Sequence, residues 1–381
     1  MKNTIPPNDI LEQTENDSRN VNAEVSIQES NSTNSNNAIF KLENLIKIHH
    51  DFHQYIKNID DPEKIYYDKK AVRTIYLIIN NVYCANDNKL ALINLNFQYD
   101  YAKTISNLLD YSLLVLIKCI DEEKNNETKE EKTQEETNVV SDEKKKVLNL
   151  CKNLMNTLRS YSNYSIKFCN KFHEYDGIRV LTNYVGSNKL LDYYVKESEK
   201  NDKTNFKTLN TIVRGSIGSF VNLSRVYDSF TFQYETEKCV EKIINFSQKL
   251  KDIFDNRMSA YVVLASICND QEIDKFSDLK LVIPEIVDLI RKCSNLLKPD
   301  NKKNLKRFKV QLDEDKDDVY KICKIDYKGT TWHLVELLNS LYHMAVNDSI
   351  KYDIYYTHKM NEILRDICNN GNDIEIEYSL K

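Results

Sequence analysis

The chain has 381 residues, a formal net charge of −5 and 41% hydrophobic residues, with only 6 glycines and 5 prolines. This composition supplies a large packed core, and it disfavours a fold rich in tight turns or a glycine-rich phosphate loop. The negative charge argues against nucleic acid as a partner.

Nine cysteines without a CxxC pair, together with a polar start that lacks an apolar signal core, indicate a reducing compartment. We therefore expect a cytoplasmic chain, with the nucleus as an alternative. The most apolar run, 108–120, contains Asp110 and Lys118 and is shorter than the roughly 20 residues of a membrane span. The sequence thus predicts a buried helix there and no membrane partner.

Residues 1–37 are rich in Asn, Ser, Glu and Thr and show no apolar period, so we expect a disordered N-terminal tail. From residue 38 to residue 381 the apolar spacing predicts a single helical repeat domain. Three charged stretches, 121–146, 188–205 and 298–329, are predicted to be long loops inserted into it. A short segment at 374–381 is either a capping stub or a sign of a longer protein.

A pattern recurs five times along this domain: a helix ends in a short polar-apolar step, and a second apolar helix follows. The clearest copies are 341–348 followed by 360–368, and 264–270 followed by 283–290. Such a unit cannot bury its apolar face alone, so the copies are expected to stack, in an all-helical fold without a sheet. The predicted buried anchors are Val82, Leu158, Leu223, Ile267 and Met344.

Two of these stretches, 341–364 and 264–290, resemble armadillo repeats, because a step similar to "NLA-xND" precedes a segment similar to "GIPALVxLL". The segment 177–181 is a third, weaker match, and the resemblance covers roughly 72–381. It implies an all-α, armadillo-like α-solenoid, a right-handed superhelix of three-helix units, here with long charged loop insertions. The third helices of that family line a concave groove for protein partners.

Family members that hold extended peptides use a ladder of Asn on the third helix, each with a Trp four residues earlier. This chain keeps two of the Asn and none of the Trp, and its one tryptophan, Trp332, lies outside the column. A residue one position before each anchor lies well off the apolar centre of its helix, so it can face a groove. The groove candidates are Asn81, Thr157, Asn222, Ser266 and His343.

Motifs that could carry chemistry are incomplete. His49 and His53 are one helical turn apart, but no third metal ligand accompanies them. The acidic alternation at 313–317 lacks the glycine and the glutamate of a calcium loop. Residues 215–218 resemble a phosphate loop only in part, and their small side chains indicate a close approach of two helices. We predict no catalytic, cofactor-binding or metal-binding residue.

The basic cluster 302–309 is either a localisation signal, a phosphate contact, or one half of a loop that the acidic run after it neutralises. For the whole chain, the favoured hypothesis is a non-catalytic scaffold that binds a segment of a partner protein in the groove. The alternative is a structural spacer or oligomerisation array truncated from a larger signalling adaptor. RNA binding is a third hypothesis, for which no base-reading code recurs. The partner's identity and the oligomeric state are left open.

Overall fold

In the computed structural model the chain divides into two compact units, residues 1–45 and 46–381. The structure describes residues 47, 50, 61–68, 71–72, 101–127, 134–251, 253, 257–268, 270–273, 281–311 and 319–381, all within the second unit. The predicted tail 1–37 and the first repeat step, at Asn81 and Val82, lie outside the described residues.

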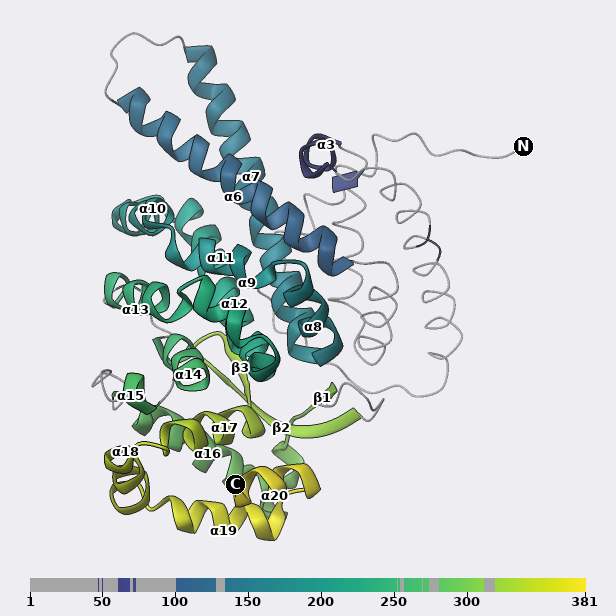
Figure 1. Cartoon of the computed structure of the whole chain (residues 1–381), viewed down its shortest axis with the longest axis vertical. Coiled ribbons are helices and arrows are strands. Elements are labelled where there is room, and N and C mark those ends of the chain that lie inside the picture. Colours follow the sequence, from purple (N-terminus) through teal and green to yellow (C-terminus); the bar gives the residue numbers. More distant parts are fainter. Residues whose placement is uncertain are drawn as a thin grey trace. The chain divides into compact units, whose positions relative to one another are not determined.

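The described part of the chain is mostly helical (Figure 1), as the apolar spacing predicts. The longer helices are α6 (Tyr101–Glu127), α7 (Gln134–Tyr164), α8 (Ile166–Glu174), α9 (Gly177–Gly186), α10 (Asn188–Glu199), α11 (Thr204–Leu223), α13 (Cys239–Lys249), α14 (Arg257–Ile267), α16 (Ile283–Leu297), α17 (Leu334–Met344), α19 (Met360–Asn370) and α20 (Asp373–Leu380). The shorter ones are α3 (Pro62–Tyr67), η2 (Ser224–Ser229), α12 (Thr231–Thr236), α15 (Asp270–Ile273), η4 (Pro299–Asn304), α18 (Asp348–Tyr352) and the π-helical turn η5 (Asp353–Thr357).

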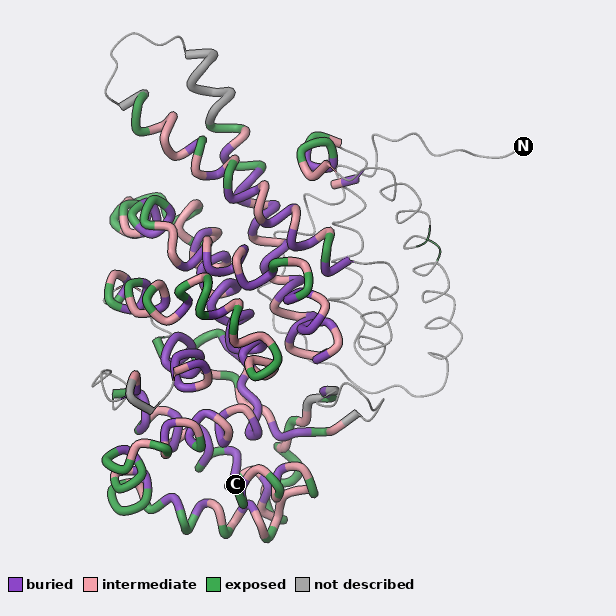
Figure 2. The backbone as a smooth tube through the Cα atoms, in the orientation of Figure 1, coloured by how far each residue is buried: buried purple, intermediate pink, exposed green. Residues whose placement is uncertain are grey.

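Four helices that each carry a predicted anchor pack against one another in chain order: α7 contacts α11, α11 contacts α14, and α14 contacts α17. We call these four helices the anchor row. Leu158, Leu223, Ile267 and Met344 lie one on each helix and are at most 4% exposed, so their predicted burial is confirmed. Buried residues run along all four helices (Figure 2).

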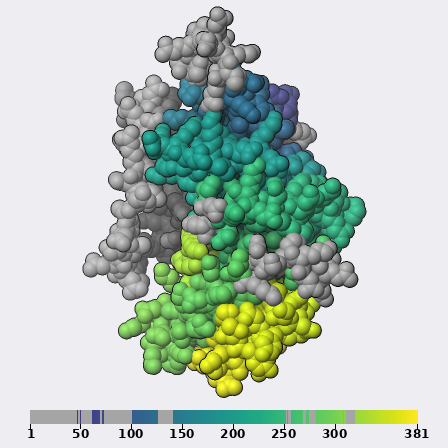
Figure 3. All heavy atoms as spheres, turned by 90° about the vertical axis from the view of Figure 1, so that its left-hand side faces the viewer, coloured from purple at the N-terminus to yellow at the C-terminus, as the bar shows by residue number. Residues whose placement is uncertain are grey.

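A second set of helices lies beside the anchor row. Each anchor-row helix is followed by one or two helices (α8 after α7, η2 and α12 after α11, α15 after α14, α18 and η5 after α17) and then by one of this second set, which comprises α9, α13, α16 and α19. Within the set α9 contacts α13 and α16 contacts α19, while α13 also packs on α14 and α16 on α17. The elements therefore succeed one another in chain order, from teal through green to yellow (Figure 3).

The contact between α7 and α11 depends on a missing side chain. A Cβ built at Gly215 would lie 2.9 Å from the Cβ of Met155, closer than two such atoms approach in proteins. The small residues at 215–218 therefore let the two helices approach closely, as the sequence indicates.

The charged stretch 121–146 is not a long loop, which corrects the prediction. α6 continues to Glu127 and α7 begins at Gln134, so only residues 128–133 between them lie outside the description. Lys and Glu are strong helix formers, and the two helices pack on each other. The Lys144 ammonium lies 2.9 Å from the Glu123 carboxylate across this contact.

The stretch 188–205 was also wrongly predicted as a loop, because most of it forms α10. Ser187 caps this helix, its hydroxyl accepting the N–H of Leu190 at 3.3 Å. Leu190, Leu191 and Tyr194 are buried, and α10 packs on α11 and α6. This apolar stripe is only a turn and a half long. Because charged residues surround it, the sequence pattern favours a loop over a helix.

The third stretch, 298–329, contains a sheet, so the expectation of a fold without strands is wrong. β1 (Arg307–Gln311), β2 (Val319–Tyr327) and β3 (Thr330–His333) pair antiparallel in the order β1-β2-β3. Lys328 and Gly329, with φ of 46° and 71°, form the two-residue turn that matches strand twist in hairpins. Val310, Ile322 and Trp332 are fully buried, which ties the sheet to the helical core.

The apolar run 108–120 lies within α6, where Leu108, Leu109 and Leu116 are fully buried. The prediction of a buried helix is thus confirmed. No helix in the described part of the chain combines the length and the apolarity that a bilayer crossing requires.

Candidate functional site

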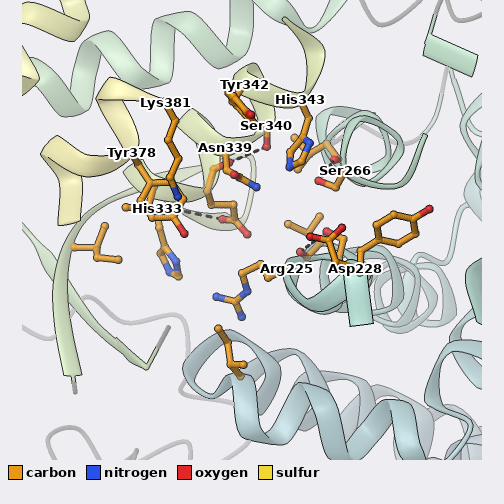
Figure 4. Close-up of a pocket in the computed structure, with 18 residues that line it drawn as sticks. Arg225, Asp228, Ser266, His333, Asn339, Ser340, Tyr342, His343, Tyr378 and Lys381 are labelled. Carbon is orange, nitrogen blue, oxygen red and sulfur yellow. Dashed lines mark hydrogen bonds between the residues drawn. The ribbon is translucent and has the colours of Figure 1, made fainter. Parts of the chain in front are cut away.

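A cleft of about 450 Å³ lies against three anchor-row helices (Figure 4). The end of α11 and the following η2 form one wall, α14 contributes Val262 and Ser266, and α17 lines the cleft from its first turn to its last. Ile166 of α8, Ile322 of β2, His333 of β3 and the end of α20 also belong to the lining. The hairpin thus supplies part of the cleft that the helical repeat alone would leave open.

The junction of β3 and α17 places a carboxylate in the cleft. His333 has extended backbone and is the N-cap of α17, and its N–H donates to Oε2 of Glu336 at 3.4 Å. The other oxygen, Oε1, is shielded from water and makes no hydrogen bond. Burial raises the pKa of Glu336, whereas the charge of Arg225 and the His333 N–H act in the opposite direction. The cleft therefore holds a carboxyl group with one oxygen that no donor in the described part of the chain reaches.

Arg225 lies on the wall of the cleft and ties two helix ends together. Its Nε donates to the carbonyl of Asn222 at 2.9 Å, and Nη1 donates to that of Asn163 at 3.5 Å. Nη2 donates to the carbonyl of Ser162. These carbonyls belong to the last turns of α7 and α11, where helices lack internal donors and favour positive charge. The guanidinium thus joins the end of α7 to the end of α11.

The two histidines of the cleft are uncharged at neutral pH. Burial lowers the pKa of His333 to about 3, and the charges of Arg225 and Lys324 act in the same direction. Burial also lowers the pKa of His343, although the carboxylate of Asp228 opposes the shift. Neither imidazole therefore neutralises the carboxylates in the cleft.

The serine hydroxyls of the cleft donate to main-chain carbonyls of their own helices. Ser340 donates to the carbonyl of Glu336 at 2.8 Å, and Ser266 donates to that of Val262 at 3.0 Å. An activated nucleophile would instead be hydrogen-bonded to a base. The lining serines that the structure describes make no such pair.

Of the five groove candidates, Ser266 and His343 line the cleft. Thr157 and Asn222 do not, because both are buried between α7 and α11. The hydroxyl of Thr157 donates to the carbonyl of Asn153 at 2.9 Å, and the amide of Asn222 donates to the carbonyl of Arg159 at 3.1 Å and to the hydroxyl of Ser162 at 3.0 Å.

Asn222 thus joins α11 to α7, whereas Thr157 bonds within its own helix, and neither buried side chain is open to a ligand. The closeness of α7 and α11 at Gly215 explains why this part of the column is covered. Asn81 lies outside the described residues.

Several residues of the cleft were not predicted, among them Arg225, Asp228 and Glu336. A local signal existed for Glu336, which stands three residues after an N-cap in the pattern of a capping box. Arg225 gives no such signal, because its carbonyl partners on α7 are more than 60 positions earlier in the chain.

Other sequence motifs do not converge on the cleft. His49, His53 and the acidic run 313–317 lie outside the described residues. Within the ranges that are described, no group of three or more His, Cys, Asp or Glu side chains is placed to hold a metal ion. The basic cluster 302–309 is split between η4 and β1, and its Arg307 pairs with Glu375 of α20.

Comparisons of the chain with protein-family models, with curated proteins and with solved structures find no match. The geometry of the cleft is therefore the basis on which a function is proposed.

Proposed function

We propose that the chain is a non-catalytic scaffold that holds a segment of a partner protein in the cleft along the anchor row. The observation that carries this proposal is the composition of the cleft wall. Three successive anchor-row helices, α11, α14 and α17, contribute to one opening of about 450 Å³. Its lining mixes aromatic, polar and charged side chains, as ligand sites do.

The arrangement of the helices supports an armadillo-like interpretation. In that family the third helix of each unit lines the groove, and the anchor-row helices take the corresponding place here. Between α11 and α14 the described residues form only the short helices η2 and α12 and the second-set helix α13. The other intervals contain α10 or the sheet, which we interpret as ordered insertions into a repeat array.

The state of the cysteines supports the expected cytoplasmic placement. The eight cysteines in the described ranges are free thiols, and six of them are buried. Burial raises the pKa of Cys151 to about 12 and that of Cys169 to about 11, so both remain protonated and serve as small apolar groups.

Selection from a display library of random peptides tests the proposal. The full chain is immobilised, and the peptides it retains are compared with those retained by Ser266→Trp, whose large side chain fills the cleft. The matched control is Ser198→Trp on α10, a helix that contributes nothing to the cleft. We expect the wild type and Ser198→Trp to enrich the same peptides and Ser266→Trp to lose them.

Loss of enrichment only in Ser266→Trp, with unchanged circular dichroism, is the expected result. If Ser266→Trp retains the same peptides as the wild type, or if the wild type retains none, binding in the cleft is refuted. The spacer or oligomerisation array would then be the better interpretation.

A further inference from the structure

The charged groups around the cleft differ in whether the protein itself has already paired them. Each of the three nitrogen atoms of Arg225 donates a hydrogen bond to a main-chain carbonyl. The ammonium of Lys381 lies 3.9 Å from the centre of the Tyr378 ring and 3.5 Å from the carboxylate of Glu377. Both cations on the cleft wall are therefore partnered within the fold.

The carboxylates of the cleft, by contrast, have no cationic partner among the described residues. Oε1 of Glu336 makes no hydrogen bond, although it is shielded from water. Asp228 also lines the cleft, from η2 (Figure 4), and no ion pair or hydrogen bond joins its carboxylate to the rest of the described chain. A buried carboxylate oxygen without a hydrogen-bond donor is unfavourable until a donor reaches it. Oε1 of Glu336 therefore still lacks a hydrogen-bond donor, although Arg225 and Lys381 also line the cleft.

Aromatic rings line the same cleft as these carboxylates. Tyr227, Tyr342 and Tyr378 line the same cleft, and Tyr342 is 48% exposed. Tyrosine rings attract cations over their faces and pack against the apolar stems of long basic side chains. The position of the Lys381 ammonium over Tyr378 is an example within the chain itself.

We propose that the cleft takes a lysine or arginine side chain of the partner segment, with its cationic head on Glu336 and its stem against the tyrosines. This inference rests on the proposed function, since it specifies which kind of segment the cleft recognises. Asp228 adds negative charge on η2 and strengthens the preference for a cation. A charge-assisted hydrogen bond of this kind is stronger than a neutral one.

The test uses the peptides selected on the wild-type chain. We expect one position of the enriched sequences to be Lys or Arg. A synthetic copy of the most enriched peptide is then titrated against the wild type, Glu336→Gln, Asp228→Asn and the control Glu362→Gln on the exposed face of α19. Replacing the basic residue of the peptide by norleucine, or Glu336 by Gln, is expected to weaken binding about tenfold or more. Glu362→Gln is expected to bind normally.

The outcomes separate the two proposals. Removing an unpaired buried charge does not destabilise a fold, so Glu336→Gln is expected to melt at or above the wild-type temperature. Should it fail to fold, the norleucine peptide and the exposed Asp228→Asn variant decide the question. A second outcome would overturn this inference alone: the enriched peptides are lost in Ser266→Trp, but they show no preference for Lys or Arg and bind Glu336→Gln and Asp228→Asn normally. The proposed scaffold function would then still stand. If no peptide depends on the cleft, both fail.

Discussion

At the scale of single residues, His173 illustrates how burial makes a side chain sensitive to acid. It is fully buried on α8, stacked on Phe230 with ring centres 4.2 Å apart. Its Nδ1 lies 3.3 Å from the side-chain oxygen of Gln233, and its Nε2 lies 3.4 Å from the carbonyl of Leu223. Burial lowers its pKa to about 4 even though both hydrogen bonds act to raise it. The neutral ring is thus part of the native packing.

This shift predicts a loss of stability in mild acid. The pKa of an unfolded histidine is about 6.5, so between that pH and about 4 the unfolded chain binds the proton more readily. The stability contributed by neutral His173 is fully present above about pH 6.5 and is lost as pH falls, by at most about 1.4 kcal/mol per unit. His333, with a pKa of about 3, adds to the same slope. His173→Phe keeps the stacking volume and should flatten the dependence.

Urea unfolding of the wild type and His173→Phe, at neutral pH and near pH 5, measures this effect. The variant is expected to be less stable at neutral pH, because the Leu223 carbonyl loses its neighbour. Its free energy of unfolding is expected to fall less than that of the wild type on acidification. An equal loss of unfolding free energy in both proteins would contradict the role assigned to His173.

Gly215 and Gly218 form a matched pair on α11. Alanine at position 215 would press against the Cβ of Met155, which cannot move without moving α7. Alanine at position 218 would meet Nε of Arg159 at 3.0 Å, near the flexible end of a long side chain. Gly→Ala improves helix propensity by about 1 kcal/mol, and overpacking costs about 1–3 kcal/mol. We expect Gly215→Ala to lower the melting temperature and Gly218→Ala to leave it unchanged or raise it. The reverse order would show that the two helices are not in tight contact.

At the scale of elements, one buried carboxylate joins α20 to the sheet. Glu375 is fully buried, and its two oxygens lie 3.1 and 3.3 Å from the Arg307 nitrogens of β1. Oε1 also accepts the N–H of Cys323 in β2 at 2.7 Å, and Oε2 accepts the N–H of Asn372 at 3.0 Å. The carboxylate therefore receives donors from two strands and from its own helix cap.

Glu375→Gln is expected to destabilise the protein by about 2–3 kcal/mol, because it leaves Arg307 without a counter-charge. That figure lies below the usual range for buried pairs because Arg307 is 27% exposed. The matched control is Glu377→Gln, two residues further along α20, where the side chain is 59% exposed and surface charge contributes little. Thermal melts of both variants measure the difference. Equal melting temperatures would show that the Arg307 pair does not hold α20.

The same scale explains what the sequence could and could not predict. The apolar spacing placed Leu158, Leu223, Ile267 and Met344 in the core, because burial on a helix follows a local period that a single sequence contains. Charge misled the interpretation of 121–146, where Lys144 is buried against Glu123 on a neighbouring helix. That pairing is a tertiary contact, which local composition cannot show.

The sheet has recognisable sequence signals of strands, although its many charged residues favour the prediction of a loop. β2 is rich in β-branched and aromatic residues, and Lys328–Gly329 forms a hairpin turn after it. For the cleft, Ser266 and His343 could be predicted from their place in the helical repeat. Arg225 could not, since its role depends on how α7 and α11 come together. The capping-box pattern indicates that Glu336 lies in the first turn of a helix, but not that it faces a cleft.

At the scale of the whole molecule, the described contacts form an unbroken series from α6 to α20. α6 packs on α7, the anchor row continues to α17, and α17 packs on α20 and on the strands. Chains of this length often divide into separately folding domains. Here residues 46–381 form one compact unit. Unfolding one part of the series alone would expose side chains that are buried between two helices. We therefore expect cooperative unfolding.

The single tryptophan of the chain makes this expectation testable. Trp332 is fully buried in β3, so its fluorescence reports on the sheet, whereas circular dichroism at helical wavelengths reports on every helix. Because β2 and β3 pack on α17, and α17 on α14, loss of the sheet removes a neighbour that the anchor row needs. The two unfolding curves in urea are expected to coincide, the accepted sign of two-state behaviour. A fluorescence transition at clearly lower urea, with helicity retained, would show that the sheet is an independent insertion. In that case the wall of the cleft formed by Ile322 and His333 could open without unfolding the helices.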